Sequence, residues 1–405
     1  MILATLLFLA QKTQPSETPK PRGFYEVALP AGDYGSINIG WFKNGATILD
    51  PKVWLDDGDD NDPEPDDYIG IRYTGQGIDK TFIRCTSWDG ITLAVGRHPG
   101  IVAFRDLTVV AGQDRATAFG EQNIGKIKEP KFQINMNGVR FVANPPVAGK
   151  RTKWLLFSYN ADLYLKDCVF DGIETAEHAL YAHGFSKRGM LIEGCKFNAS
   201  GAEGIKVRSD TTETVWAGPE AKIVVRGTSV TNWHQPHSWR GGAGMVFQGT
   251  GCDILIEGCV LRGGYTAGNI PANDRSKAIM ISSEGLSYDA ETGSANVGYG
   301  NGNVIIRDTI AWGHSDVDWR NTLIRCDQNS GLQFSARSLL IENCGLYGKL
   351  MAIGVGKVPQ GQFILRGCNT ANVKRRAMEL GIDTTYQAYF PTSSRKVLVS
   401  EGISR

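Results

Sequence analysis

A six-residue motif recurs nine times along the chain and constrains the fold more than any other feature. Its first and third positions are apolar in every copy, and its fifth position is always Asp, Gly or Asn. Successive copies begin 32, 29, 27, 33, 31, 50, 35 and 24 residues apart, a repeat length typical of solenoids. The nine copies are Val102–Leu107, Ile134–Val139, Leu163–Cys168, Met190–Cys195, Ile223–Thr228, Ile254–Cys259, Val304–Thr309, Leu339–Cys344 and Phe363–Cys368.

The motif predicts a short strand followed by a sharp bend. A period of two means that one strand face points into a core. Asp, Gly and Asn tolerate left-handed backbone angles, so the chain can turn at the fifth position, and the sixth side chain points inward again. Stacking the repeats in register pairs every strand edge, and parallel crossovers are almost always right-handed. We therefore predict an all-β, right-handed parallel β-helix of about ten or more coils, capped at both ends.

The fourth position of the motif carries charges that alternate in sign from the third copy onward. In a parallel stack these side chains lie one above another, about 4.8 Å apart, where like charges would repel. The alternation therefore predicts that Glu257 and Arg307 are neighbours, and that the 50-residue interval between their motifs is one coil with long insertions. The seven residues are Lys166, Glu193, Arg226, Glu257, Arg307, Glu342 and Arg366.

Composition and the chain ends give the expected domain organisation. Glycine is abundant, at 49 of 405 residues, while proline is ordinary at 16, which favours many tight turns. We expect a hydrophobic leader and linker at 1–22, the β-helix at 23–368 and a cap at 369–405. The β-helix carries an acidic loop at 56–67 and insertions near 229–243 and 263–303. In the cap, 375–380 is expected to start a helix and 396–399 to form a strand.

The first ten residues, from Met1 to Ala10, are apolar and end near a small residue, as in a secretory signal peptide. The alternative is that this segment covers the first coil of the core. The run is too short to span a bilayer, which needs about 20 residues. We expect an extracellular or secreted protein, or alternatively a virion component, that exists as a monomer or homotrimer. The net charge of +1 gives no indication of nucleic-acid binding.

Five of the eight cysteines occupy the sixth motif position, which favours a role in core packing. No C-x-x-C spacing occurs, so a zinc or thioredoxin-like motif is not predicted. Neighbouring coils bring Cα atoms into disulfide range, so a Cys168–Cys195 bond is geometrically allowed. Free buried thiols are the preferred interpretation.

With these repeats the chain resembles the pectate-lyase-like superfamily of right-handed parallel β-helices over roughly residues 65–370. The superfamily includes polysaccharide lyases, glycosidases, epimerases and phage tailspikes. The resemblance implies the fold and a sugar-binding groove on one outer face. The paired-Asp motifs of polygalacturonase-like enzymes and the calcium-binding Asp set of pectate lyases are not recognisable in this sequence, so fold alone does not assign an activity.

A second strand precedes most motif copies, at 179–183, 204–208, 244–248, 278–282 and 322–326. β-Elimination of a uronic acid polymer needs cations that neutralise the sugar carboxylate and a base that takes the C5 proton. Lys206, Arg208 and Arg325 suit the first role, and His183 or Lys206 the second. A solvated strand face would also carry such charges. The expected outward side chains are Tyr181, His183, Lys206, Arg208, Val246, Gln248, Met280, Ser282, Arg325 and Asp327. The expected substrate-binding residues are Tyr181, Gln248, Trp239, Arg240, Glu284 and Asp327.

Two alternatives remain beside a lyase-type enzyme. Hydrolysis needs two carboxyl groups about 5–10 Å apart, and no pair is forced by the spacing. The candidate carboxyl residues for hydrolysis are Glu177, Asp210, Glu284, Asp316, Asp318 and Asp327. The second alternative is a non-catalytic structural or receptor-binding β-helix of a phage virion or cell surface.

Metal sites find little support. His234 and His237 have no evident third ligand, so zinc is not predicted. Calcium is a candidate cofactor only at the acidic loop, where Asp57, Asp59 and Asn61 have calcium-loop spacing. The sixth-position Gly and twelfth-position Glu of an EF-hand are absent, so a solvated loop is the preferred interpretation.

Overall fold

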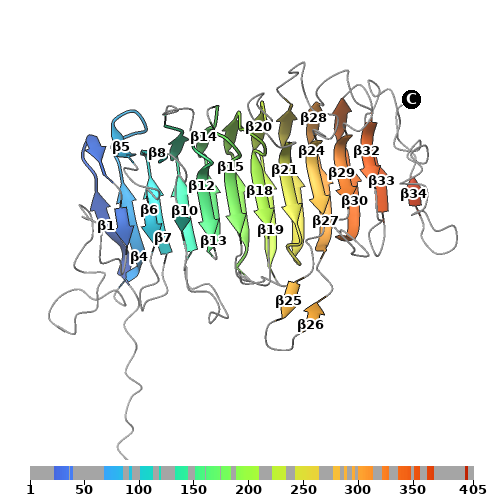
Figure 1. Cartoon of the computed structure of the whole chain (residues 1–405), viewed down its shortest axis with the longest axis horizontal. Helices are drawn as coiled ribbons and strands as arrows, with labels where there is room; N and C mark the ends of the chain where they lie inside the picture. The colour runs from blue at the N-terminus through green and yellow to red at the C-terminus, as the bar shows by residue number, and fades with distance from the viewer. Residues whose placement is uncertain are drawn as a thin grey trace, which may run out of the picture.

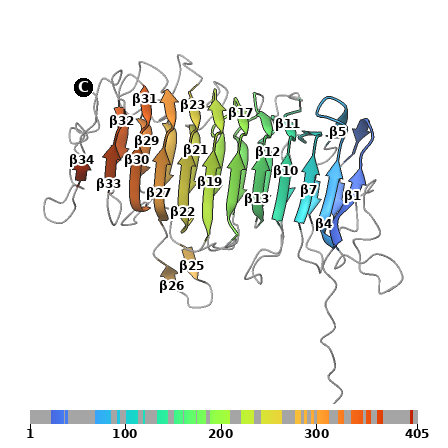
Figure 2. The same cartoon turned by 180° about the vertical axis from the view of Figure 1, so that it is seen from behind.

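All nine motif copies lie side by side as strands of one parallel sheet, and the coils follow chain order along the long axis of the molecule (Figures 1 and 2). The computed structural model of the chain is thus a parallel β-helix, which confirms the predicted fold class. Every regular element in the described part of the chain is a strand. The structure describes residues 22–35, 37–39, 68–84, 91–93, 101–112, 118–119, 133–144, 151–159, 161–173, 175–183, 188–208, 221–233, 242–263, 277–282, 287–289, 294–296, 300–312, 322–327, 336–347, 351–355, 363–368 and 397–399.

Each complete coil contributes one strand to each of three parallel sheets, here called A, B and C. Sheet A contains β1 (Arg22–Ala28), β4 (Tyr68–Thr74), β7 (Ile101–Arg105), β10 (Gln133–Asn137), β13 (Asp162–Lys166), β16 (Met190–Glu193), β19 (Lys222–Arg226), β22 (Asp253–Glu257), β27 (Asn301–Arg307), β30 (Ala336–Glu342), β33 (Phe363–Arg366) and β34 (Val397–Val399). Sheet B contains β2 (Gly32–Tyr34), β5 (Thr81–Arg84), β8 (Thr108–Val110), β11 (Arg140–Val142), β14 (Val169–Asp171), β17 (Lys196–Asn198), β20 (Ser229–Thr231), β23 (Val260–Arg262), β28 (Ile310–Trp312) and β31 (Gly345–Tyr347). Sheet C contains β3 (Ile37–Ile39), β6 (Ile91–Leu93), β9 (Ala118–Phe119), β12 (Trp154–Tyr159), β15 (His178–His183), β18 (Ile205–Arg208), β21 (Ala243–Gln248), β24 (Lys277–Ser282), β29 (Thr322–Asp327) and β32 (Met351–Val355).

The fifth motif position turns the chain from sheet A into sheet B. In all nine copies this residue has a positive φ, between 50° at Asp308 and 64° at Gly194. The sixth residue is buried in every copy, including Thr228 and Thr309. The predicted bend and the predicted inward side chain are both confirmed, because each turn must reverse direction without a loop.

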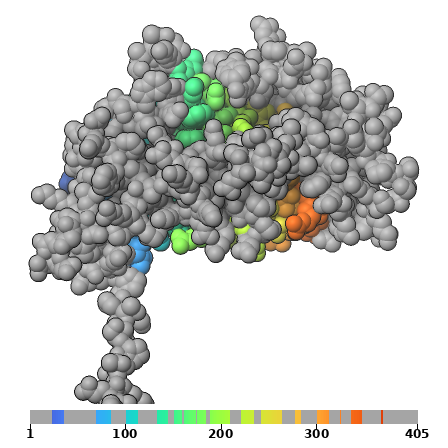
Figure 3. Space-filling view, turned by 60° about the horizontal axis from the view of Figure 1, so that its bottom comes forward, coloured from blue at the N-terminus to red at the C-terminus, as the bar shows by residue number. Residues whose placement is uncertain are grey.

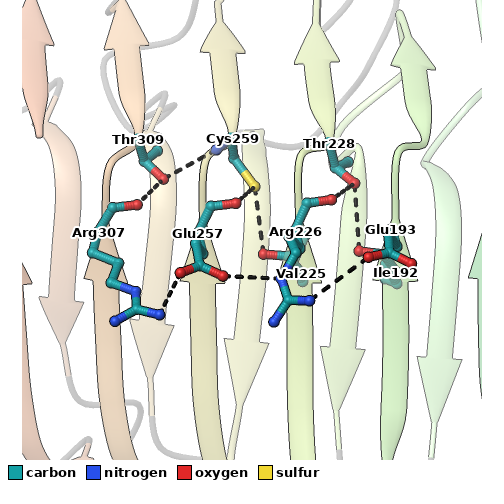
Figure 4. A network of polar contacts seen from close by, with 9 residues as sticks. All are labelled: Ile192, Glu193, Val225, Arg226, Thr228, Glu257, Cys259, Arg307 and Thr309. Atoms are coloured by element: carbon teal, nitrogen blue, oxygen red, sulfur yellow. Dashed lines mark hydrogen bonds and ion pairs between the residues drawn. The ribbon is translucent and has the colours of Figure 1, made fainter.

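The alternating charges form a ladder on the outer face of sheet A (Figure 4). Successive ladder residues are register partners from Lys166 through to Arg366. Arg226 lies 3.7 Å from Glu193 and 2.9 Å from Glu257, and Glu257 also pairs with Arg307. The pKa of Glu257 is lowered, chiefly by its hydrogen bond with Arg307 and also by Arg226. The predicted register across the 50-residue interval is confirmed.

The core is a continuous column of apolar side chains from all three sheets. In sheet B the rings of Phe141, Phe170 and Phe197 stack, with centroids 4.6 and 4.3 Å apart and planes within 7°. Parallel stacking of this kind follows from identical positions on successive coils. The sequence analysis missed sheet B, because most of its strands have only three residues and show no periodicity of their own.

The structure describes parts of the predicted insertions and of the chain ends. Within the predicted insertion at 263–303, β25 (Ser287–Asp289) and β26 (Ser294–Asn296) form a separate antiparallel pair below the stack in Figure 1. The predicted insertion at 229–243 is shorter than expected, because it begins with β20 of sheet B. Strand β34 adds a last strand to sheet A. The leader, the acidic loop and the expected helix at 375–380 lie outside the described residues, and the proposed domain boundaries remain predictions.

Candidate functional site

The outer face of sheet C presents two rows of side chains, as alternation along its strands predicts. The inward residues Ile205, Val207, Met245, Phe247, Ile279 and Ile281 are fully buried. By register, one outward row runs through Phe157, Tyr181, Lys206, Val246 and Met280 to the backbone position of Arg325. The other runs from the backbone position of Tyr159 through His183, Arg208, Gln248 and Ser282 to the backbone position of Asp327. Figure 3 shows residues of the central coils, coloured green, reaching the surface between residues drawn in grey.

Four of the predicted site residues come together on β15 and β18. Tyr181 is the register partner of Lys206, and His183 is the partner of Arg208. The Lys206 ammonium lies 5.5 Å from the centre of the Tyr181 ring, within cation–π range. Lys206 and Arg208 are partly exposed, whereas Tyr181 and His183 are only 9% and 7% exposed. The two cations can therefore meet a ligand, and the two rings form a fixed surface beside them.

Tyr181 is enclosed by aromatic rings, of which only His183 was predicted to belong to the site. The ring of His183 stacks on it at 5.5 Å, and Phe157 and Trp154 tilt against it at 5.3 and 5.5 Å. The edge of His178 approaches at 5.2 Å. Lys153 adds a further cation 5.8 Å from the centre of the Trp154 ring. An aromatic surface beside cations suits a ligand with both an apolar ring face and negative charge.

Two buried carboxylates contact the same imidazole ring next to Tyr181. Nδ1 of His178 lies 2.6 Å from Oε2 of Glu203, and its Nε2 lies 3.6 Å from Oε2 of Glu177. The indole N–H of Trp154 donates to the same Glu177 oxygen at 3.1 Å. Glu177 had been considered only as a carboxyl group for hydrolysis, and Glu203 had not been singled out. Aligning the sheet C strands by their apolar positions would have placed Glu203 beside His178.

Glu203 remains ionised over a wide pH range. Burial alone would raise the pKa of its carboxyl group. The charges of His178, Lys206 and Lys277 outweigh burial and lower the pKa to about 2. A carboxylate with such a low pKa cannot serve as a general acid near neutral pH. Glu203 therefore acts on its neighbours as a fixed negative charge.

Arg325 lies on the predicted face but not beside the other cations. Strands β21 and β24 separate β29 from β18, so Arg325 is three strands away from Lys206, or about 14 Å along the stack. Asp327 occupies the corresponding place in the other row, next to Ser282. The buried Ser282 hydroxyl makes no hydrogen bond within the described part of the chain. The expectation that the three cations lie on adjacent coils is corrected by this register.

Most of the remaining predicted site residues are not described by the structure. Trp239, Arg240 and Glu284, like the other hydrolysis candidates Asp210, Asp316 and Asp318, lie outside the described residues. Trp233, from the same aromatic segment as Trp239, packs in the core and is 1% exposed. Gln248 is described and is 9% exposed.

The described ranges contain no group of three or more His, Cys, Asp or Glu side chains that could hold a metal ion. They also contain no helix long and apolar enough to cross a bilayer. His234 and His237 lie outside the described residues.

No protein-family model and no curated protein matches the chain. Solved structures of similar fold include the catalytic domain of a GH87 alpha-1,3-glucanase in complex with tetrasaccharides, with 13% identity, a TM-score of 0.43 and coverage of 94% of this chain and 65% of that one. They also include the A-module of a mannuronan C-5 epimerase from Azotobacter vinelandii, with 12% identity, a TM-score of 0.38 and coverage of 86% and 91%. A mannuronic acid specific polysaccharide family 6 lyase from human gut microbiota has 9% identity, a TM-score of 0.32 and coverage of 93% and 86%. These likenesses concern the overall fold and assign no function to the chain.

Proposed function

We propose that the outer face of sheet C binds an acidic polysaccharide and that the protein is a carbohydrate-active enzyme that cleaves it by β-elimination. The observation that carries this proposal is the pairing of two partly exposed cations with two rings on adjacent strands. Lys206 lies beside Tyr181, and Arg208 is the register partner of His183. A uronic acid presents both a carboxylate for the cations and a ring face for an aromatic surface.

The charge balance around Tyr181 supports an anionic ligand. Four cations, Lys153, Lys206, Arg208 and Lys277, belong to this part of sheet C, against the two carboxylates of Glu177 and Glu203. Glu203 already lies in an ion pair with His178. A polyanion would therefore meet an excess of positive charge that also accelerates its association.

The proposed reaction divides its chemistry between these residues. Lys206 and Arg208 neutralise the sugar carboxylate, which makes the C5 proton more acidic. A nitrogen of His183 takes that proton, the C4–oxygen bond to the next sugar breaks, and a C4–C5 double bond forms. The departing sugar oxygen takes up a proton from water and becomes a hydroxyl group. Trp154 and Tyr181 position the sugar ring. Arg325, three strands along the stack, would contact a carboxylate further along the same polymer. A secreted protein would meet such a polymer outside the cell.

The proposal is tested by incubating the purified chain with a panel of uronic acid glycans and measuring the ultraviolet absorbance of unsaturated products. Lys206→Ala and Arg208→Ala are each expected to lower activity by about 100-fold or more with nearly unchanged thermal stability. Lys166→Ala, which removes an exposed cation from sheet A, is the matched control and should retain full activity.

Unchanged activity in both sheet C variants would rule out this face as the active site. Wild-type binding to a glycan that Lys206→Ala abolishes, without unsaturated ends on any substrate, would indicate a carbohydrate-binding protein without lyase activity. New reducing ends without unsaturated products would instead indicate hydrolysis. Stable trimers that neither bind nor cleave any glycan would favour the structural β-helix of a virion or cell surface.

A further inference from the structure

The sixth motif position forms a column of buried side chains in which cysteines are adjacent at only two places. In stack order the column reads Leu107, Val139, Cys168, Cys195, Thr228, Cys259, Thr309, Cys344 and Cys368. Cys168 is therefore next to Cys195, and Cys344 is next to Cys368. Cys259 lies between two threonines. All five cysteines are 1% exposed or less, and no disulfide joins them in the structure.

The backbone gives each adjacent pair the same geometry. The residues before Cys168 and Cys195 both have a left-handed φ, of 51° and 64°. Register pairing is continuous on both sides, from Lys166 with Glu193 to Val169 with Lys196. Adjacent strands lie about 4.8 Å apart, inside the range of about 4.4–6.8 Å that disulfides require between Cα atoms.

The second pair follows the same arrangement. Asn343 and Gly367, with φ of 51° and 63°, precede Cys344 and Cys368. Glu342 pairs with Arg366 in the strands that lead into the two turns. The two cysteine side chains therefore also leave equivalent backbone positions one strand apart.

Each pair of thiols is close enough for one thiol to affect the pKa of the other. The pKa of the Cys195 thiol is raised, first by its hydrogen bond with the Cys168 thiol and then by burial. The pKa of the Cys344 thiol is raised in the same way by Cys368. Cys259 differs, because its neighbours in the column are threonines and burial is the largest cause of its raised pKa, about 11.

We propose that Cys168–Cys195 and Cys344–Cys368 form two disulfides when the chain folds under oxidising conditions, whereas Cys259 and Cys252 remain thiols. In each pair the two thiols lose two protons and two electrons, and a disulfide oxidant is reduced to two thiols. Because the folded column is buried, this exchange takes place while the coils assemble. Each bond then ties one coil to the next, independently of any activity on glycans.

The test is oxidative refolding of the denatured full chain in a mixture of oxidised and reduced glutathione. Remaining thiols are alkylated with N-ethylmaleimide under denaturing conditions, and tryptic peptides are analysed by mass spectrometry without reduction. Cys168 and Cys195 fall in the separate peptides 167–187 and 189–196, and Cys344 and Cys368 in 338–349 and 367–374. Peptide 241–262 contains both Cys252 and Cys259 and serves as the internal control.

We expect peptide 167–187 to be linked to 189–196 and peptide 338–349 to be linked to 367–374. Both cysteines of peptide 241–262 should be alkylated. Complete alkylation of both pairs in refolded protein, or linkage through Cys259, would refute the proposal. Cys168→Thr and Cys259→Thr provide matched variants, because threonine already occupies this position in two coils. The oxidised wild-type chain should have a higher Tm than the reduced chain. Cys168→Thr should reduce that difference, and an equal reduction by Cys259→Thr would count against the pairing.

Discussion

Nδ1 of His178 lies 2.6 Å from Oε2 of Glu203, a buried ion pair that joins the start of β15 to the residue that leads into β18. The contact fixes the imidazole whose edge approaches Tyr181. Glu203 also attracts Lys206 and Lys277. One carboxylate therefore holds together the ring and the cations of the candidate site.

This ion pair should make stability depend on pH below about 5. The pKa of Glu203 is about 2 in the folded chain, against an ordinary value of 4.5, so its ionised form stabilises the fold above pH 4.5. That contribution is lost as the pH falls from 4.5 through 2. Glu203→Gln should destabilise the chain at pH 7 by up to about 3 kcal/mol, since each pKa unit corresponds to about 1.4 kcal/mol. At pH 3 the difference from wild type should be less than half as large.

The measurement is thermal or urea unfolding of both proteins at pH 7 and pH 3. Glu26→Gln is the control, because Glu26 forms an exposed ion pair with Arg72 that contributes little. A Glu203→Gln deficit that stays constant between the two pH values would contradict the buried charge interaction.

Glycan binding at the sheet C face should separate into a charged part and an aromatic part. Lys206→Ala should lower affinity for a polyuronate by about tenfold or more at low salt. Added salt should reduce this difference in affinity between variant and wild type, because it screens charges. Trp154→Ala should lower affinity by several-fold at all salt concentrations, because stacking is not screened. Titration calorimetry at two ionic strengths distinguishes the two patterns. Equal salt dependence of both variants would argue against cation-mediated binding.

The sequence predicted the stack well because its signals repeat in every coil. The apolar alternation, the left-handed turn residue and the alternating charges each occur at fixed motif positions, so Glu257 could be matched with Arg307 across 50 residues. The site is different, because it is built from residues that occur once. Glu203 and His178 meet only because two coils are in register, so they can be paired from the sequence only after the apolar positions of β15 and β18 have been aligned.

Alternation of apolar and polar residues predicts on which face of a strand a side chain lies, but not how far apart two side chains are along the stack. It assigned Lys206 and Arg325 to one row of sheet C, which agrees with their backbone register, but it did not count the strands between them. Two strands intervene, so the two cations do not form one cluster. Outward direction did not imply exposure either, because Tyr181 and His183 are covered by neighbouring rings and remain buried.

The charge ladder of sheet A should respond to charge reversal more than to charge removal. Glu257→Gln should lower Tm only slightly, because its partners Arg226 and Arg307 are largely solvated. Glu257→Lys places three cations in a row and should lower Tm further. The additional loss should shrink in about 1 M salt, where the Debye length falls to about 3 Å. Equal Tm values for the two variants at low salt would show that the ladder does not contribute to register.

The left-handed residues at the fifth motif position predict that replacing glycine by alanine destabilises the chain by different amounts in different coils. Gly258 and Gly194 have nearly equal φ, 61° and 64°, so alanine at either position incurs the left-handed penalty of about 1–2 kcal/mol. At Gly258 a methyl group would meet only ordinary contact, 3.9 Å from the amide nitrogen of Gly227. At Gly194 it would collide with Oδ1 of Asp167 in the preceding turn. Gly194→Ala should therefore destabilise the chain more than Gly258→Ala.

A double variant isolates the steric part of that cost. Asp167 itself has a φ of 51°, so Asp167→Gly leaves the turn free to adopt its angles and removes the colliding oxygen. In the Asp167→Gly background, Gly194→Ala should cost no more than Gly258→Ala does alone. Urea unfolding of the four chains measures the coupling between the two positions. If Gly194→Ala lowers the free energy of unfolding by the same amount in the wild type and in the Asp167→Gly background, the turns of these two successive coils do not contact each other. Each coil would then set its own bend independently of its neighbour.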